Sequence, residues 1–403
     1  MGKKPGLEIG VAVADITPPV GAIMVGYKPR QSTALGHTLR AEALVVRDSG
    51  GGAWALITSD TIGYPRGYVQ DVRRMIAART PLAAEAVIVS GTHTHSGPAT
   101  SMFGGEELKP LDVKYLESLK ETLADLVARA WADAAPGVLE VAYTKAPTLG
   151  SNRRVKLADG TWGNEWNDPD GKHPGFFDPT VMLVGVRRPA GPLAALVVAY
   201  GCHPVVLGPS SLDISADYPG YLKDELERRG VADTVLFVNG GGANINPRVC
   251  IQVGPEHPKR MGEALAGIVA PAVANLKPIA AGTVRSRQEP WNIVRTRDAI
   301  KGQQSPGRKT GETIATEIQA FRAGDLSLVS LPGELFSEYQ GMLREASPTE
   351  HTVVVSLAND YIGYFPTDEA QAQGAYETNM CPAAEFEGLL MGCARKAFGA
   401  IAD

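Results

Sequence analysis

The segment Ser90-Gly91-Thr92-His93-Thr94-His95-Ser96-Gly97-Pro98 contains two of the seven histidines of the chain, two residues apart. The preceding run, Ala86-Val87-Ile88-Val89, is short, apolar and mostly β-branched, which is typical of a buried strand. Ser96-Gly97-Pro98 continues neither a strand nor a helix, so we expect the histidines on a turn where the strand ends. Residues i and i+2 of an extended segment point the same way, which predicts that His93 and His95 face one site.

Three other apolar runs are also followed by polar residues suited to chemistry. They are His203 after residues 193–200, Glu334 after residues 325–331 and Tyr364 after residues 353–357. Ligands of α/β proteins collect beyond the carboxyl ends of strands. Two histidines and a glutamate form a known catalytic zinc set that leaves a position open for water. The pattern therefore predicts a metal site at strand ends, although each residue alone also fits an ordinary turn or packing role.

Strand-like and helix-like segments alternate along the chain. Strands are predicted at 8–16, 43–46, 53–58, 86–89, 180–187, 193–200, 234–238, 282–289, 312–321, 325–331 and 353–357, and helices at 66–79, 111–134, 218–229 and 257–276. We find no internal repeat, low-complexity segment or linker. We therefore expect an α/β (α+β) protein, with one or more central β-sheets flanked by helices, as a single compact domain over residues 1–403.

Composition excludes several classes of protein. The formal net charge is −5 and no basic block occurs, so we expect no nucleic-acid partner. No stretch approaches the roughly 18 apolar residues of a membrane span. The four cysteines are widely spaced and form no CxxC pair, which disfavours a disulfide framework and a cysteine zinc site. Without a visible secretory signal we expect a cytoplasmic protein, and a secreted form whose signal has been removed stays open.

Two other stretches invite a functional interpretation. Cys202 directly precedes His203, but strand alternation would turn the two side chains to opposite faces, so a buried, inert thiol is favoured over a nucleophile. The polar run 164–175 is rich in helix and strand breakers and resembles an ordered surface loop of the kind that carries substrate contacts. The triple glycine at 240–242 lacks the Lys-Ser/Thr of a phosphate-binding loop and is a weak phosphate signal.

The segment His93-Thr94-His95-Ser96-Gly97-Pro98 resembles the signature of the neutral/alkaline ceramidase family, zinc amidases that cleave N-acyl-sphingosine. The similarity recurs in order along nearly the whole chain. The matching segments are Asp15-Ile16-Thr17-Pro18-Pro19, Asn152-Arg153, His203-Pro204, Ser215-Ala216-Asp217 with Gly220-Tyr221, Pro332-Gly333-Glu334, Asn359-Asp360-Tyr361-Ile362-Gly363-Tyr364, Gln371-Ala372-Gln373 and Tyr376-Glu377.

The resemblance implies roles for particular residues. One Zn²⁺ per chain would be bound by His93, His203, Glu334 and Tyr364. The residues implied around the reacting carbonyl are His95, Arg153 and Tyr376. Arg153 or Tyr376 would stabilise the tetrahedral oxyanion, and His95 would relay a proton or orient the water. Ligands of these types also accept manganese or iron, so the sequence leaves the native metal open.

The chain departs from the family pattern in two respects. The family carries a Gly-Asp-x-Ser-Pro segment with an essential serine, whereas this chain has Asn244 where the aspartate and Asn246 where the serine is expected. An amide is neither a hydroxyl nucleophile nor a general base, but it can donate a hydrogen bond to an oxyanion, so Asn246 joins the candidate catalytic residues. The chain also ends at residue 403, from which we expect the family's C-terminal immunoglobulin-like domain to be missing.

These features predict a zinc-dependent hydrolase that uses activated water to cleave the amide (C–N) bond of a small soluble molecule. The absence of a rich amphipathic segment favours such a substrate over a sphingolipid, and we expect no stable membrane association. Three alternatives stay open: an ester or lactone hydrolase, a lyase on the same scaffold, and a zinc-containing binding protein that has lost catalysis. The oligomeric state is not encoded in any recognisable pattern.

Overall fold

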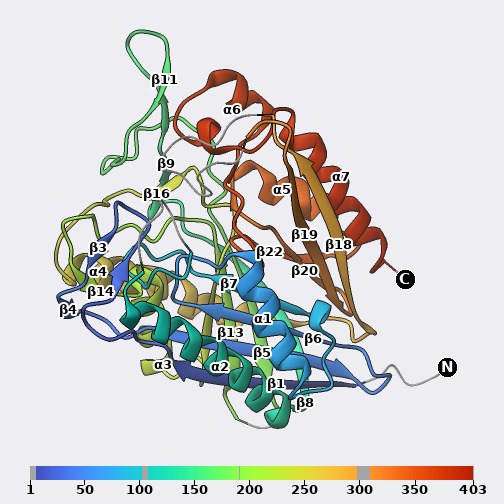
Figure 1. Ribbon diagram of the computed structural model, residues 1–403. Coiled ribbons are helices and arrows are strands. Elements are labelled where there is room, and N and C mark those ends of the chain that lie inside the picture. The colour runs from blue at the N-terminus through green and yellow to red at the C-terminus, as the bar shows by residue number, and fades with distance from the viewer. Residues whose placement is uncertain (1–5, 102–107, 190, 297–308, 403) are drawn as a thin grey trace.

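The computed structural model describes residues 6–101, 108–189, 191–296 and 309–402. Helices flank a large mixed sheet, which confirms the predicted α/β class (Figure 1). The strand order in this sheet is β15-β13-β12-β8-β1-β5-β6-β7, with β17 attached to β8. Neighbours are antiparallel except for the two outer pairs, β13 with β15 and β6 with β7.

The strands of the main sheet are β1 (Leu7–Asp15), β5 (Arg40–Asp48), β6 (Ala53–Ser59), β7 (Val87–Gly91), β8 (Ala135–Lys145), β12 (Thr180–Arg187), β13 (Leu193–Tyr200), β15 (Val235–Asn239) and the short β17 (Lys277–Pro278). Every residue of β7 and β15 is buried. Such continuous apolar runs form strands because both faces of the sheet are covered.

Four helices cover this sheet. The pair α1 (Arg66–Ala77) and α2 (Pro110–Asp133) packs on β1, β5 and β6, and the pair α3 (Asp217–Arg228) and α4 (Glu256–Ala272) packs on β8 and β15 (Figure 1). In α1 the buried apolar residues Val69, Val72 and Ile76 lie at helical spacing, as predicted. Within the described ranges, none of the helices combines the length and apolar character that crossing a bilayer requires.

A second sheet, with the order β18-β19-β20-β22, is formed by the C-terminal part of the chain. Its strands are β18 (Val284–Val294), β19 (Thr313–Ala323), β20 (Leu326–Ser330) and β22 (His351–Val355). The helices α5 (Glu338–Ala346) and α7 (Phe386–Gly399) pack on it around a core of their own, in which Phe365 and Phe386 are fully buried. The short α6 (Asp368–Gln373) lies above this sheet in Figure 1.

Short strand pairs and 3-10 turns complete the described fold. The strand pairs are β2 (Ile23–Met24) with β3 (Arg30–Gln31), β4 (Ala34–Leu35) with β14 (Asp213–Ile214), β9 (Gly150–Asn152) with β16 (Ile245–Pro247), β10 (Arg154–Lys156) with β11 (Trp162–Asn164), and β21 (Glu334–Leu335) with β23 (Tyr364–Phe365). The 3-10 turns are η1 (Ala84–Ala86), η2 (Val273–Asn275) and η3 (Glu377–Met380).

The carboxyl ends of strands from both sheets meet. The outer strands β7 and β15 contact each other, and β15 also contacts β22. Asn239, at the end of β15, donates from Nδ2 to the carbonyl oxygen of Thr92 at 3.1 Å and receives the Ser356 backbone N–H at 3.0 Å on its own carbonyl oxygen. The predicted convergence of strand ends is therefore confirmed, and it brings residues 92–95, 240–246 and 356–364 together.

Candidate metal centre

His93 leaves β7 on a strained backbone. Its φ is +77°, in the left-handed region that non-glycine residues rarely adopt. β7 ends at Gly91, so the histidines lie on a turn past the strand end, as predicted, although the alternation of an extended segment does not apply there. The two rings nevertheless come together, with centroids 4.8 Å apart, because the His93 N–H bonds to the Thr61 carbonyl oxygen at 2.8 Å and turns the chain.

His93 is oriented by a backbone carbonyl group. Its Nδ1 lies 2.8 Å from the carbonyl oxygen of Ile62, which fixes the proton on Nδ1 because a carbonyl oxygen only accepts. The lone pair of Nε2 is therefore free, and Nε2 is buried without a hydrogen-bond partner among the described residues. A histidine held in this way is typical of a metal ligand.

His203 is oriented in the same manner by the triple-glycine turn. Its Nδ1 lies 2.6 Å from the carbonyl oxygen of Gly242, so its Nε2 also presents a lone pair. A Cβ atom on Gly242 would lie 2.7 Å from the backbone nitrogen of Cys202, which explains why only glycine fits there. The glycines therefore serve close packing beside His203. Burial raises the pKa of the Cys202 thiol well above its usual range, as expected for an inert cysteine.

Glu334 directs its carboxylate at both histidines. Its Oε2 lies 2.9 Å from Nε2 of His203 and 3.5 Å from Nε2 of His93. Burial alone would raise the pKa of Glu334, but His93 and His203 hold it well below its usual range. Burial and then Arg153 lower the pKa of His203. The facing atoms are thus both acceptors, an arrangement that a cation between them satisfies.

His95 completes the cluster and has no hydrogen-bond partner for either ring nitrogen within the described structure. Its ring packs edge-on against Tyr27, and Gly26, at φ +100°, leaves room for it, because a Cβ there would lie 2.5 Å from the ring. Burial, followed by His93 and His203, holds the pKa of His95 well below its usual range. His93, His95 and His203 offer ligand atoms that all lie within 4.8 Å of one another, so a three-histidine set also fits a cation.

Two tyrosines border Glu334. The hydroxyl of Tyr361 donates to Glu334 Oε1, and the hydroxyl of Tyr364 accepts from Arg153 Nη2 at 3.4 Å. Tyr364 enters the site because β21 and β23 pair Glu334 with Tyr364 in register. Nothing in the sequence pattern singled out Tyr361 as a neighbour of the carboxylate.

Arg153 is buried beside these ligands and held on three sides. Its Nε donates to Glu377 Oε1 at 2.8 Å, its Nη1 to Asn246 Oδ1 at 3.2 Å and its Nη2 to Tyr364. Burial alone would lower its pKa, but Tyr364 and Glu377 raise it far above the usual range, so the guanidinium is always charged. A fixed positive charge beside a candidate metal site suits the stabilisation of a developing oxyanion.

Glu377 is the principal site residue to which the sequence assigned no role. It is completely buried between two arginines, and it also accepts from Arg154 Nη1 at 3.0 Å and from Asn164 Nδ2 at 2.6 Å. Its position directly after Tyr376 was the only available signal. The network anchors the strand pair β10–β11 to the segment that carries Tyr376.

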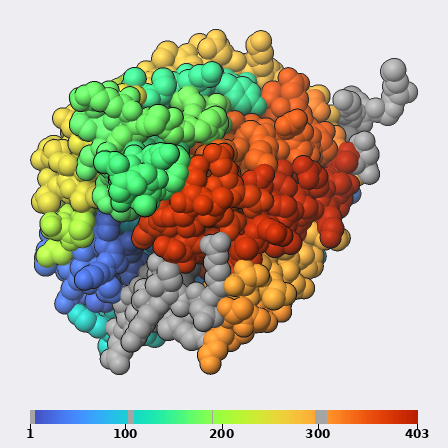
Figure 2. Space-filling model, turned by 90° about the horizontal axis from the view of Figure 1, so that it is seen from above, coloured from blue at the N-terminus to red at the C-terminus, as the bar shows by residue number. Residues whose placement is uncertain are grey.

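Tyr376 and Trp166 lie at the solvent-exposed end of the site. They are 43% and 40% exposed, their rings meet edge-on at 5.8 Å between centroids, and the Arg153 guanidinium lies 5.2 Å from the Trp166 ring. In Figure 2 the green segment that contains Trp166 lies against the orange-red C-terminal segment that contains Tyr376. The polar run 164–175 thus places Trp166 beside Arg153, while its predicted contact with substrate stays a prediction.

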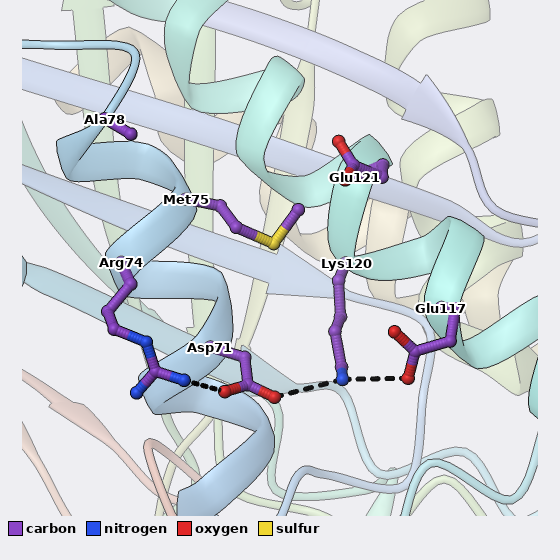
Figure 3. Close-up of a pocket in the computed structure, with 7 residues that line it drawn as sticks. All are labelled: Asp71, Arg74, Met75, Ala78, Glu117, Lys120 and Glu121. Carbon is purple, nitrogen blue, oxygen red and sulfur yellow. Dashed lines mark hydrogen bonds and ion pairs between the residues drawn. The ribbon is translucent and has the colours of Figure 1, made fainter.

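A separate surface pocket lies between α1 and α2 (Figure 3). Lys120 bridges Asp71 at 3.0 Å and Glu117 at 2.9 Å across it. The pocket contains none of the predicted site residues, and its charged side chains are engaged in ion pairs. It is therefore unrelated to the histidine cluster.

Comparison with known proteins places this arrangement in a family. The family model "neutral/alkaline non-lysosomal ceramidase, N-terminal" matches residues 7–242, more than half of the chain. Among solved structures, the neutral ceramidase from Pseudomonas aeruginosa is 18% identical, with a TM-score of 0.78 over 99% of this chain and 74% of that one. A ceramidase complexed with C2 is also 18% identical, with a TM-score of 0.78 over 99% of this chain and 75% of that one.

At this identity the solved structures establish the fold alone. No curated protein gives a significant match. The family model and the fold agree with the resemblance in the sequence. The chain therefore belongs to the neutral/alkaline ceramidase family and is a hydrolase that acts on the carbon–nitrogen bond of amides.

Proposed function

We propose that this chain hydrolyses the amide bond of a ceramide-like N-acyl lipid at a zinc site formed by His93, His203, Glu334 and Tyr364. The observation that carries the proposal is the approach of His203 Nε2 and Glu334 Oε2 to 2.9 Å, beside the unpartnered Nε2 of His93. Lone pairs on three buried atoms, His93 Nε2, His203 Nε2 and Glu334 Oε2, converge there. A bound zinc ion supplies Lewis acidity, which lowers the pKa of water and polarises an amide carbonyl.

The protein groups around the ligands have distinct proposed tasks. Arg153 keeps its positive charge and stabilises the negative charge that develops on the carbonyl oxygen. Neutral His95, with both ring nitrogens unpartnered, accepts a proton from water or delivers one to the leaving amine. The hydroxyl of Tyr376, at the exposed end of the site, orients the substrate amide.

We propose a lipid amide as the substrate, in place of the small soluble molecule expected from the sequence. The matching family and both solved neighbours are ceramidases, which favours a lipid amide. The exposed rings of Trp166 and Tyr376 beside Arg153 give an apolar contact for such a substrate.

Metal content and turnover test the proposal together. We expect one zinc per chain in the wild type and none in His93→Ala/His203→Ala. The double variant His257→Ala/His351→Ala, which removes two histidines outside the cluster, is the matched control and should retain zinc. Ceramide and a panel of short N-acyl amides and esters are the substrates. Preference for ceramide supports the proposal, and preference for short amides would contradict the lipid substrate.

Two other results would contradict the proposal more deeply. Bound zinc without turnover of any amide would point to a binding protein. Incorporation of no solvent ¹⁸O into the acid product would exclude hydrolysis and favour elimination.

A further inference from the structure

The side chain of Asn246 has its polar atoms engaged by the protein itself. The residue is 2% exposed. Its Oδ1 accepts from Arg153 Nη1 at 3.2 Å, and its Nδ2 donates to the Trp166 carbonyl oxygen at 3.2 Å and lies 3.6 Å from Cys250 Sγ. An asparagine amide offers two N–H donors and one oxygen with two lone pairs, so these contacts engage both donors and one lone pair.

The orientation of this amide is fixed by its partners. An arginine only donates and a backbone carbonyl oxygen only accepts, so Oδ1 must face Arg153 and Nδ2 must face Trp166. The backbone is fixed as well, because the β9–β16 pair places Asn246 opposite Ser151. To reach an oxyanion, the amide would have to give up a buried hydrogen bond, which is costly.

The segment that contains Trp166 makes further hydrogen bonds to the segment that contains Asn246. The carbonyl oxygen of Trp166 also accepts from Cys250 Sγ at 3.0 Å. The Cys250 N–H bonds to Asn167 Oδ1 at 2.8 Å, and the Asp168 N–H bonds to the Arg248 carbonyl oxygen at 2.8 Å. Residues 166–168 therefore lie along residues 246–250, and Asn246 joins that contact to the site.

We infer that Asn246 is a positioning residue, which aligns the Arg153 guanidinium and fixes the exposed Trp166 loop beside it, and that it donates no hydrogen bond to the substrate. The inference rests on the proposed function, since it assigns Asn246 a place in the same site. It replaces the oxyanion-donor role considered from the sequence. Asn246 acts on catalysis through Arg153 and on substrate binding through Trp166.

Two substitutions separate the two halves of this role. Asn246→Asp keeps an oxygen for Arg153 but loses the donor to Trp166, whose carbonyl oxygen would then face a carboxylate. Asn246→Ser is too short to span both partners and loses both. Asn244→Ser is the matched control, because Asn244 is buried on the same turn but bonds to the Ser337 N–H and to Glu338 instead.

The first measurement is amide hydrogen exchange, which needs no substrate. We expect Asn246→Asp and Asn246→Ser to accelerate exchange at Glu165 and Asp168, whose N–H groups bond to Arg153 and Arg248, by about tenfold relative to the wild type. Asn244→Ser should leave these two amides unchanged. Unchanged exchange in both Asn246 variants, or equal acceleration in the control, would overturn the inference.

The second measurement is the separation of kcat from KM with ceramide. We expect Asn246→Asp to raise KM about tenfold with kcat preserved, and Asn246→Ser to lower kcat about tenfold as well. Identical kinetics in the two variants would overturn the inference. If the wild type hydrolyses no amide, the proposed function fails on that result, while the exchange measurement still decides the role of Asn246.

Discussion

The Nε2 atom of His203 lies 2.9 Å from the Oε2 atom of Glu334, and both atoms are hydrogen-bond acceptors in the neutral form of His203 that is protonated on Nδ1. The His203 proton is committed to the Gly242 carbonyl oxygen through Nδ1. Without a cation, two buried lone pairs face each other and the contact is repulsive. A cation between the two atoms would remove this repulsion. We therefore expect the repulsion to lower the free energy of unfolding of the metal-free protein.

The variant Glu334→Gln tests whether the repulsion between His203 and Glu334 destabilises the metal-free protein. A glutamine can donate from its amide nitrogen to His203 Nε2 and still accept from Tyr361, so we expect the metal-free variant to be about 1 kcal/mol more stable than the metal-free wild type. It should also lose zinc. Urea unfolding after dialysis against a chelator measures the first effect, and elemental analysis the second. Lower stability of the metal-free variant would mean that the pair shares a proton.

The two tyrosines beside Glu334 separate alternative ligand sets. We predict that Tyr364→Phe removes a zinc ligand and lowers kcat/KM by more than about a hundredfold, whereas Tyr361→Phe loses the hydrogen bond to Glu334 but no zinc ligand and costs about tenfold. Zinc affinity, measured by competition with a chromogenic chelator, should follow the same order. The opposite order would identify Tyr361 as the ligand, and equal losses would favour the three-histidine set.

The strands that position the site were predictable because their burial is continuous. The predicted ranges 180–187 and 193–200 coincide with β12 and β13, which are apolar on both faces. In contrast, β8 was not predicted, because Pro136 and Gly137 near its start are typical of a turn. The helix α7 was also missed, since three glycines dilute its helical pattern.

From the sequence, the site residues could be predicted only as histidine, glutamate and tyrosine side chains that follow strands. Their alignment depends on backbone groups that no pattern reveals, such as the carbonyl oxygens of Ile62 and Gly242 that orient the two histidines. The positive φ of His93 likewise comes from tertiary contacts. The partners of Asn246 come from chain segments about 80 and 93 residues away, so its engagement could not be foreseen.

The buried carboxylate of Glu377 predicts a specific pH dependence of stability. Burial alone would raise the pKa of Glu377, but Arg153 and Arg154 hold it below 4.5, its ordinary value. A depressed pKa in the folded state adds stability that is present above the unfolded value and is lost as pH falls through the folded value. Glu377→Gln should therefore be about 3 kcal/mol less stable at pH 7, with a difference that shrinks below about pH 4.5.

Urea unfolding of the wild type and Glu377→Gln across this pH range measures the difference. Glu369→Gln, an exposed carboxylate in α6, is the control and should show little effect at any pH. A difference that stays constant with pH would mean that Glu377 stabilises through shape and not through charge.

Lys223 is a fully buried cation that supports the loop under His93. Its Nζ lies 2.8 Å from Glu42 Oε1 and 2.8 Å from both oxygens of Asp60, and all three side chains are at most 1% exposed. Asp60 begins the turn whose Ile62 carbonyl oxygen orients His93. Removal of the cation leaves two buried carboxylates beside each other, which costs about 3–5 kcal/mol.

We therefore predict that Lys223→Met lowers the free energy of unfolding by about 3–5 kcal/mol and weakens zinc binding as the turn relaxes. Arg228→Ala, which removes an exposed partner of Glu225, is the control and should have little effect on stability. Lys223→Met/Glu42→Gln removes one of the two stranded charges and should recover part of the loss. If Lys223→Met unfolds no more easily than Arg228→Ala, the carboxylates must take up a proton instead, and the double variant would then gain nothing over the single one.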